Sequence, residues 1–177
     1  MKFQILKAIT IVAIVLFSTS CFDDQTKELE EWKKLNETYY NNMKDSTGFN
    51  LYQIPLEYGG GSFYYKTIKA GDENASKPWL SDTVKVNYKG MLVDGTIFDS
   101  TYNGTNPISN PSAKPARFIV NRLISGWVYT LIDMTPGEVR TIVLPASLSY
   151  GSVPIGIIKP YSTLRFDIHL DSFQVSN

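Results

Sequence analysis

The sequence is poor in the residues on which most metal sites and nucleophilic mechanisms depend. It has a single histidine, His169, and a single cysteine, Cys21, among 177 residues. Such a pair cannot assemble a Cys/His metal centre, and no nucleophile is placed beside the histidine for Ser-His-Asp or Cys-His chemistry. A lone cysteine also excludes an intramolecular disulfide, so burial alone must hold the fold together. The sequence therefore predicts neither a metal nor a cofactor.

An excess of charge of either sign is also missing. The 17 basic residues balance the 17 acidic ones, and no block of five or six like charges occurs. Nucleic-acid surfaces are usually basic, and phosphate sites often use a glycine-rich loop, but the sequence has neither signal. Nucleic acid is therefore not an expected partner.

Long hydrophobic runs are absent as well. The apolar run AITIVAIVLF, Ala8 to Phe17, has ten residues, whereas a permanent membrane-spanning helix needs about 20. Two lysines precede this run and the small residues 18–20 follow it, which is the layout of a signal peptide. We therefore predict that residues 1–20 are a cleaved signal peptide.

The cysteine directly after this segment suggests a lipid anchor. "STSC" resembles a bacterial lipobox, in which Cys21 takes a diacylglycerol and becomes the N-terminus, although Ser18 replaces the usual leucine. Two or three acyl chains give stable anchoring, since each buried CH₂ contributes about 0.8 kcal/mol. This interpretation predicts a bacterial cell envelope protein, on the periplasmic or surface face of the outer membrane. The alternative is an ordinary signal peptide with an incidental cysteine.

An amphipathic helix is expected next. Residues 27–44 contain no glycine or proline, and apolar residues recur every three or four positions, at Leu29, Trp32, Leu35, Tyr39 and Met43. The helix either docks on its own domain, acts as a spacer, or pairs two copies of the chain into a homodimer. Three glycines at 59–61 indicate a flexible linker, so we assign residues 21–61 to the lipidated N-terminus, helix and linker, and 62–177 to the main domain.

The main domain reads as strands around one short helix. Strands are expected over 62–72, 84–92, 96–98, 138–145 and 162–173, with an Asp94-Gly95 hairpin turn and a helix over 125–134. One face of the second strand is apolar and the other polar, as in a sheet with one wet side. His169 falls on the polar face of the last strand and is expected to be exposed and without a role. The order predicts an α+β fold.

Five fragments of this domain resemble one known family. "VNYKGMLVDGTIFDST", "KPARF", "LISGW", "PGEVRTIVLPASLSYG" and "TLRFDIHL" follow in the order and near the spacing of FKBP-type (FK506-binding protein) peptidyl-prolyl cis-trans isomerases. The bacterial envelope lipoprotein variety is the most similar. The resemblance spans about two thirds of the chain and implies a half-wrapped antiparallel β-sheet around one short α-helix. It also implies isomerase activity on X–Pro bonds of exported proteins, and inhibition by FK506-like macrolides.

The resemblance further implies a set of site residues. The expected catalytic residues are Tyr88, Phe98, Asp99, Trp127 and Tyr150. The expected substrate-binding residues are Phe118, Leu123, Ile124, Ile157, Ile158 and Phe166, with the Ile124 N–H donating to a substrate carbonyl. By pattern alone the strand aromatics and the tryptophan would be core residues, and Asp99 a turn or strand-end cap.

A second function is compatible with the same fold. A non-catalytic chaperone or partner-binding lipoprotein would keep the fold and hold proline-containing polypeptides without turning them over. The complete catalytic set favours the isomerase. The loop 102–115 beside the pocket is longer than is usual in the family. Because this loop lies next to the site, the resemblance says least about which substrates are preferred.

Overall fold

A computed structural model describes residues 24–104 and 113–176 of the chain. The predicted signal peptide, the lipidation residue Cys21 and residues 105–112 of the long loop lie outside the described residues. Within the described part of the chain, no helix combines the length and the apolar character that crossing a membrane requires.

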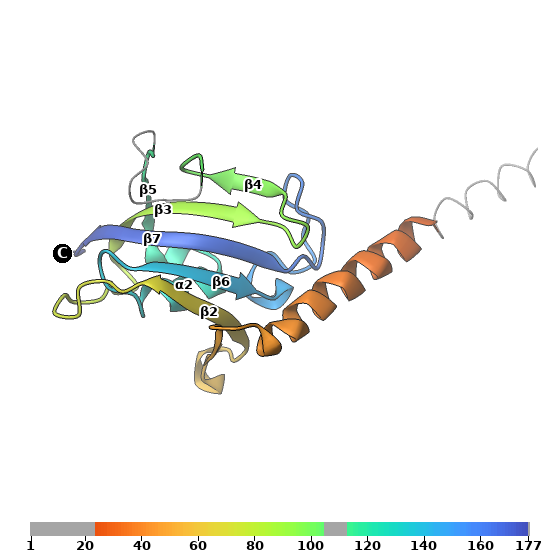
Figure 1. The fold of residues 1–177 in the computed structure, drawn as a ribbon, viewed down its shortest axis with the longest axis horizontal. Coiled ribbons are helices and arrows are strands. Elements are labelled where there is room, and N and C mark those ends of the chain that lie inside the picture. The colour runs from red at the N-terminus through yellow and green to blue at the C-terminus, as the bar shows by residue number, and fades with distance from the viewer. Residues whose placement is uncertain (1–23, 105–112, 177) are drawn as a thin grey trace, which may run out of the picture.

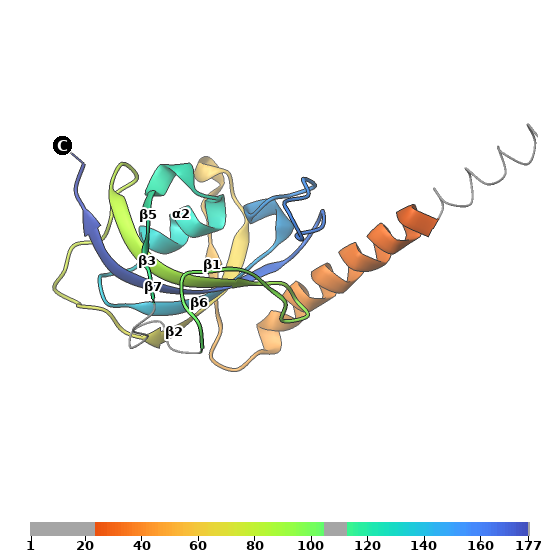
Figure 2. The ribbon, with the colours of Figure 1, turned by 90° about the horizontal axis from the view of Figure 1, so that it is seen from above.

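The domain is an antiparallel sheet of seven strands that curves around one helix (Figures 1 and 2). The sheet order is β1-β2-β6-β7-β3-β4, and β5 also pairs with β3. The strands are β1 (Asn50–Gln53), β2 (Ser62–Lys69), β3 (Thr83–Met91), β4 (Ile97–Ser100), β5 (Ala116–Ile119), β6 (Val139–Leu144) and β7 (Leu164–Gln174). The predicted α+β fold is confirmed.

Helices are few in the described residues. A long N-terminal helix covers residues 24–42, and α2 (Ser125–Leu131) lies inside the curved sheet. Four short 3₁₀ helices connect other elements: η1 (Met43–Asp45), η2 (Leu56–Tyr58), η3 (Val120–Arg122) and η4 (Ala146–Leu148). The predicted short helix is therefore present, and it ends three residues earlier than expected.

The core lies between α2 and the concave face of the sheet. Leu131 of α2 is fully buried there, as are Ile142 and Leu144 of β6. Gly126 permits the close approach, because a Cβ at this position would lie 2.4 Å from Cδ2 of Leu144. This contact fixes the first turn of α2, and with it Trp127, against the sheet.

The N-terminal helix projects from the domain (Figure 2), and its contacts with the domain begin at Glu28, which pairs with Lys159 at 2.6 Å. The anchor is Asn36, which is fully buried: its Oδ1 accepts a 2.7 Å hydrogen bond from the Thr163 N–H, and its backbone oxygen accepts one from the Thr163 hydroxyl. Trp32 adds a bond from its indole N–H to the Ser162 hydroxyl. Leu35, predicted in the apolar stripe, is 52% exposed because the docked face centres on Asn36.

Two short strands lie outside the strand ranges expected from the sequence. β1 falls inside the segment interpreted as a linker and pairs with β2, with Asn50 opposite Tyr65. β5 pairs with β3, with Phe118 opposite Val84. Each has four residues, too few to display a clear alternation, so pairing with a longer neighbour rather than local pattern makes them strands.

The expectation that His169 is exposed is wrong. Its side chain lies on the outer face of the sheet but is only 7% exposed, directly opposite Asn87 of β3, which is 5% exposed. The segment after β4 folds back over β3 here, with Thr101 bonded to Tyr88 and Lys89 over the ring of Tyr102. Burial lowers the pKa of His169, so the ring stays neutral at physiological pH.

Candidate functional site

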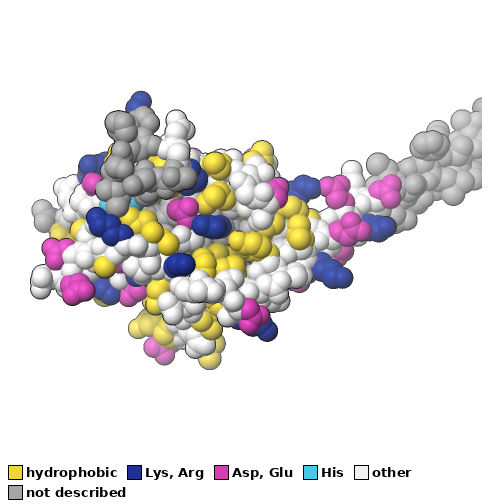
Figure 3. Space-filling model, viewed as in Figure 1, with side chains coloured by type: hydrophobic (Ala, Val, Ile, Leu, Met, Phe, Trp, Pro, Cys, Tyr) yellow, Lys and Arg dark blue, Asp and Glu magenta, His cyan; other side chains and the backbone are white. Residues whose placement is uncertain are grey.

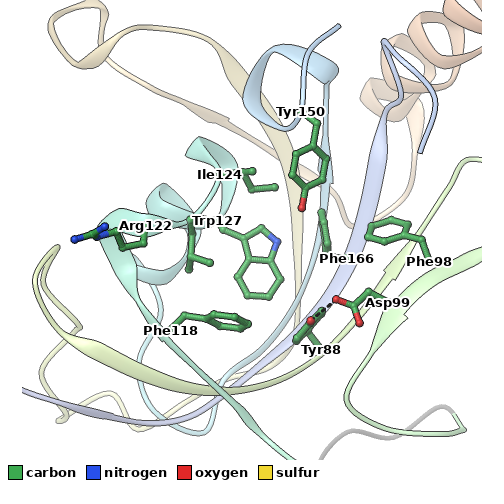
Figure 4. A pocket seen from close by; sticks show the side chains of 10 residues that line it. Tyr88, Phe98, Asp99, Phe118, Arg122, Ile124, Trp127, Tyr150 and Phe166 are labelled. Carbon is green, nitrogen blue, oxygen red and sulfur yellow. Dashed lines mark hydrogen bonds between the residues drawn. The ribbon is translucent and has the colours of Figure 1, made fainter. Parts of the chain in front are cut away.

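Aromatic rings from five elements surround a hollow of about 260 Å³ at the mouth of the curved sheet (Figure 4). Trp127, in the first turn of α2, forms its floor. The indole meets the ring of Tyr88 edge-on at 5.1 Å, that of Phe166 at 5.3 Å and that of Phe118 at 6.1 Å between centroids. Phe98 extends the wall by an edge-on contact with Phe166 at 5.6 Å. Edge-to-face packing of this kind stabilises aromatic clusters and leaves ring faces open to a ligand.

A glycine allows two of these rings to reach the wall. Gly90 lies on β3 between Phe98 and Phe166. A Cβ at this position would lie 2.5 Å from Cζ of Phe98 and 3.0 Å from Cε1 of Phe166. Any larger residue would displace the rings, so the shape of the hollow depends on this glycine.

One carboxylate borders the apolar hollow. The Tyr88 hydroxyl donates a short hydrogen bond to Oδ2 of Asp99, which lies on β4 next to Phe98. Burial, this hydrogen bond and the charge of Asp99 raise the pKa of Tyr88, so the phenol keeps its proton. Phe98 and Asp99, adjacent on β4, thus give this edge of the pocket an apolar ring and a negative charge side by side.

Two hydrogen-bond donors are available at the rim. The Tyr150 hydroxyl points into the hollow (Figure 4) and has no partner among the described residues. Burial, and then the charge of Asp99, raises its pKa. The backbone N–H of Ile124, just before α2, also has no acceptor among the described residues, while its carbonyl accepts from Trp127 and Val128. Both donors could bind the carbonyl oxygens of a peptide.

Nine of the eleven predicted site residues line this hollow. The five assigned to catalysis are there, together with Phe118, Leu123, Ile124 and Phe166. Ile157 and Ile158 do not line it: Ile157 is 57% exposed, and Ile158 is buried in the core. Both follow Gly156, which has a positive φ of 55°, and Ile158 exchanges backbone hydrogen bonds with Ile155 across this turn.

Sequence reasoning missed one lining residue, Arg122. It ends η3 immediately before Leu123, and its guanidinium points away from the hollow (Figure 4). Its position directly before Leu123 and Ile124, which are both expected to bind substrate, was the only available signal. Within the described residues, no group of three or more His, Cys, Asp or Glu side chains could hold a metal ion. The chemistry open to the site is binding in an apolar, aromatic pocket.

Comparisons with known proteins agree with this geometry. Residues 74–171 match the family described as FKBP-type peptidyl-prolyl cis-trans isomerase. The chain is 37% identical over 147 residues to "Outer membrane protein MIP" of Legionella longbeachae, a match covering 82% of this chain and 56% of that protein. It is 39% identical over 106 residues to FkpA, an FKBP-type isomerase of Escherichia coli K12, covering 60% of this chain and 36% of FkpA. The chain therefore spans between about a third and just over a half of the length of these relatives.

The fold comparison gives the same answer. The crystal structure of FkpA from Escherichia coli matches with a TM-score of 0.71 at 26% sequence identity, covering 98% of this chain and 72% of that one. The matched family region contains all the residues around the aromatic hollow. The chain belongs to the FKBP-type peptidyl-prolyl cis-trans isomerase family.

Proposed function

We propose that this chain is a peptidyl-prolyl cis-trans isomerase that acts on X–Pro bonds of exported proteins and assists their folding. The observation that carries the proposal is the apolar hollow floored by Trp127, with the Tyr88–Asp99 hydrogen bond at its edge. The proposed catalytic residues are Tyr88, Phe98, Asp99, Trp127 and Tyr150.

The reaction needs no nucleophile or proton donor. An X–Pro bond isomerises in about tens to hundreds of seconds without a catalyst, because resonance keeps the amide planar behind a barrier of about 18–20 kcal/mol. The twisted transition state loses this resonance and much of the amide dipole. A pocket of aromatic rings that excludes water therefore favours the twisted form over the planar one, which is differential binding of the transition state.

The polar groups at the rim would orient the substrate. The Ile124 N–H and the Tyr150 hydroxyl would donate to the peptide carbonyls on either side of the proline, while the ring enters the hollow. Phe118, Leu123 and Phe166 would contact the proline and its neighbours. Asp99 would hold the phenol of Tyr88 in place and present negative charge at the pocket edge.

Turnover of a short X–Pro peptide tests this function. We expect the full chain, purified in detergent, to accelerate isomerisation of a tetrapeptide, and FK506 to abolish that acceleration, because the macrolide would fill the same aromatic hollow. The matched measurement is FK506 binding followed through tryptophan fluorescence. A folded protein that binds the drug without turning over peptide would contradict catalysis and favour a partner-holding role.

The N-terminus is proposed to anchor the protein in the bacterial envelope. Support comes from the lipobox-like residues before Cys21 and from the name of the Legionella relative, an outer membrane protein. We expect Cys21→Ser to move the protein from the membrane fraction to the soluble fraction of expressing cells. Because two or three acyl chains supply the binding energy, a serine variant that still sediments with membranes would contradict lipidation at this residue.

The N-terminal helix is proposed to pair two copies of the chain. The helix projects from the domain (Figures 1 and 2), and Leu35 on its flank is 52% exposed. We expect Leu35→Lys to lower the dimer mass to that of a monomer in sedimentation equilibrium, because the charge would be buried between helices. The exposed Leu51→Lys serves as the matched control. Equal masses for the parent and the Leu35→Lys protein would contradict the pairing.

A further inference from the structure

A second surface feature adjoins the aromatic hollow: the tip of the β1–β2 hairpin, residues 54–61. The tip lies beside α2, to which it is tied by the Tyr129 hydroxyl donating to the Tyr58 carbonyl at 2.8 Å. Leu56 at the tip is 91% exposed and Tyr58 is 64% exposed. The tip protrudes below the sheet in Figure 1, and hydrophobic side chains gather there in Figure 3. Neither Leu56 nor Tyr58 belongs to the buried core.

Between this tip and α2 lies a hollow of about 270 Å³, here named the hairpin hollow. Tyr58 and the glycines 59–61 form one side, and Ser125 and Tyr129 of α2 form another. Ser147 and Leu148 close it from the segment after β6. None of its lining residues carries a charge, so the hollow suits a neutral ligand.

Two chain segments contribute neighbouring residues to the hairpin hollow and to the aromatic hollow. The segment around the start of α2 gives Ile124 to the aromatic hollow and Ser125 to the hairpin hollow. The segment after β6 likewise gives Tyr150 to the first and Leu148 to the second. The two hollows therefore adjoin along the same pair of segments. Because Ile124 and Ser125 are consecutive, their Cα atoms are about 3.8 Å apart, which is about one residue of an extended chain.

The chemistry of the hairpin hollow fits a polypeptide. The hydroxyls of Ser125 and Ser147 have no partner among the described residues, so they are available to the amide groups of a bound backbone. The exposed side chains of Leu56 and Tyr58 would be removed from water by an apolar side chain of that polypeptide. A strongly charged ligand would find no counter-charge among the lining residues.

We propose that the hairpin hollow is an extended subsite that binds an apolar stretch of the polypeptide substrate a few residues from the isomerised proline. This inference rests on the proposed isomerase function and specifies its substrate class. The protein would prefer unfolded chains in which apolar residues flank the proline. A short peptide would occupy only the aromatic hollow and gain nothing from the hairpin.

Two peptides and one double variant test the subsite in the full chain. The probes are a tetrapeptide with one X–Pro bond and a dodecapeptide with the same bond and leucine at alternate flanking positions. We expect Leu56→Ser with Tyr58→Ser to lower kcat/KM about fivefold for the dodecapeptide, as partial loss of one apolar contact implies, and to leave the tetrapeptide unchanged. Both replaced side chains are exposed, so the fold should persist, which circular dichroism would check.

The matched control is Val175→Ser, which removes a side chain that is 65% exposed just beyond the end of β7. It should leave both peptides unchanged. An equal kcat/KM of parent and double variant on the dodecapeptide, or an equal loss on both peptides, would overturn the subsite and leave the isomerase intact. A parent protein that turns over neither peptide would instead overturn the isomerase function, and the subsite with it.

Discussion

Replacing Trp127 with alanine is expected to lower kcat/KM for an X–Pro peptide by about 100-fold, the equivalent of about 3 kcal/mol of transition-state stabilisation. The indole is 4% exposed and meets three other aromatic rings edge-on. Its removal opens the floor of the hollow to water, which solvates the planar amide and cancels the preference for the twisted one. The same change should lower the free energy of unfolding by about 3–5 kcal/mol, because it leaves a large cavity.

Two variants separate the catalytic loss from the structural one. Leu131→Ala removes a fully buried side chain from the same helix without touching the hollow, so it should cost about 2–5 kcal/mol of stability and leave kcat/KM unchanged. Trp127→Phe keeps an apolar floor and should retain most of the activity. Stability would come from urea unfolding, and activity from conditions in which every variant is folded. Unchanged kcat/KM in folded Trp127→Ala would refute the assignment of this pocket.

The long strands were predictable because the alternation of apolar and polar residues along each of them reveals which side chains are buried. In β3, Val84 and Val86 are fully buried while Lys85 between them is not, and this alternation marks a strand without knowledge of its partners. The Asp94-Gly95 turn was also predictable from adjacent residues, because an Asp-Gly pair favours a hairpin turn that needs a positive φ. Gly95 indeed adopts a φ of 84°. Such features depend on a few adjacent residues.

The polar anchors of the fold could not be predicted in this way. Asn36 is buried because Thr163, 127 positions later, supplies its partners. His169 is buried although Asp167 and Asp171 alternate with it along β7, because Asn87 of another strand lies opposite it and the chain after β4 folds back nearby. In both cases the decisive contacts join distant segments, and polarity alone predicts the opposite, an exposed side chain.

The candidate site was predictable only from motifs taken together. Trp127 and Phe166 look like ordinary core residues, and both are indeed buried, so local pattern does not distinguish a pocket wall from a core. The joint resemblance led to the residues around the hollow. It also placed Ile157 and Ile158 at the pocket, which neither residue lines. The direction of a loop side chain depends on the conformation of the turn that carries it, and the motif does not specify that conformation.

Replacing Asp99 with alanine is expected to lower kcat/KM about tenfold, an effect of about 1.4 kcal/mol. The carboxylate accepts the hydroxyl hydrogen bond of Tyr88 and thereby fixes this ring in the wall of the hollow. Because Asp99 is exposed on β4, the free energy of unfolding should change by no more than about 0.5 kcal/mol. Peptide turnover and urea unfolding of the same preparation check both values.

A double-mutant cycle identifies how Asp99 acts. If it orients the phenol, Tyr88→Phe should cause a similar loss, and the double variant should lose no more than either single one. If its negative charge acts directly on the substrate, Asp99→Asn should be as impaired as Asp99→Ala while Tyr88→Phe stays active. We expect the first result, because the hydrogen bond already joins the two groups.

The pH profile provides an independent check of that hydrogen bond. Burial and Asp99 raise the pKa of Tyr88 above its usual value of about 10. A phenol with a raised pKa remains a donor below that value and loses its proton only as the pH rises through the shifted pKa, so kcat/KM should stay level from neutral pH to about 10. In Asp99→Ala the hydrogen bond and the charge are gone, so Tyr88 should titrate at lower pH than in the parent. Ultraviolet difference spectra of the parent and the Tyr88→Phe protein would assign that titration to this phenol, and identical spectra for the parent and Asp99→Ala would contradict the coupling.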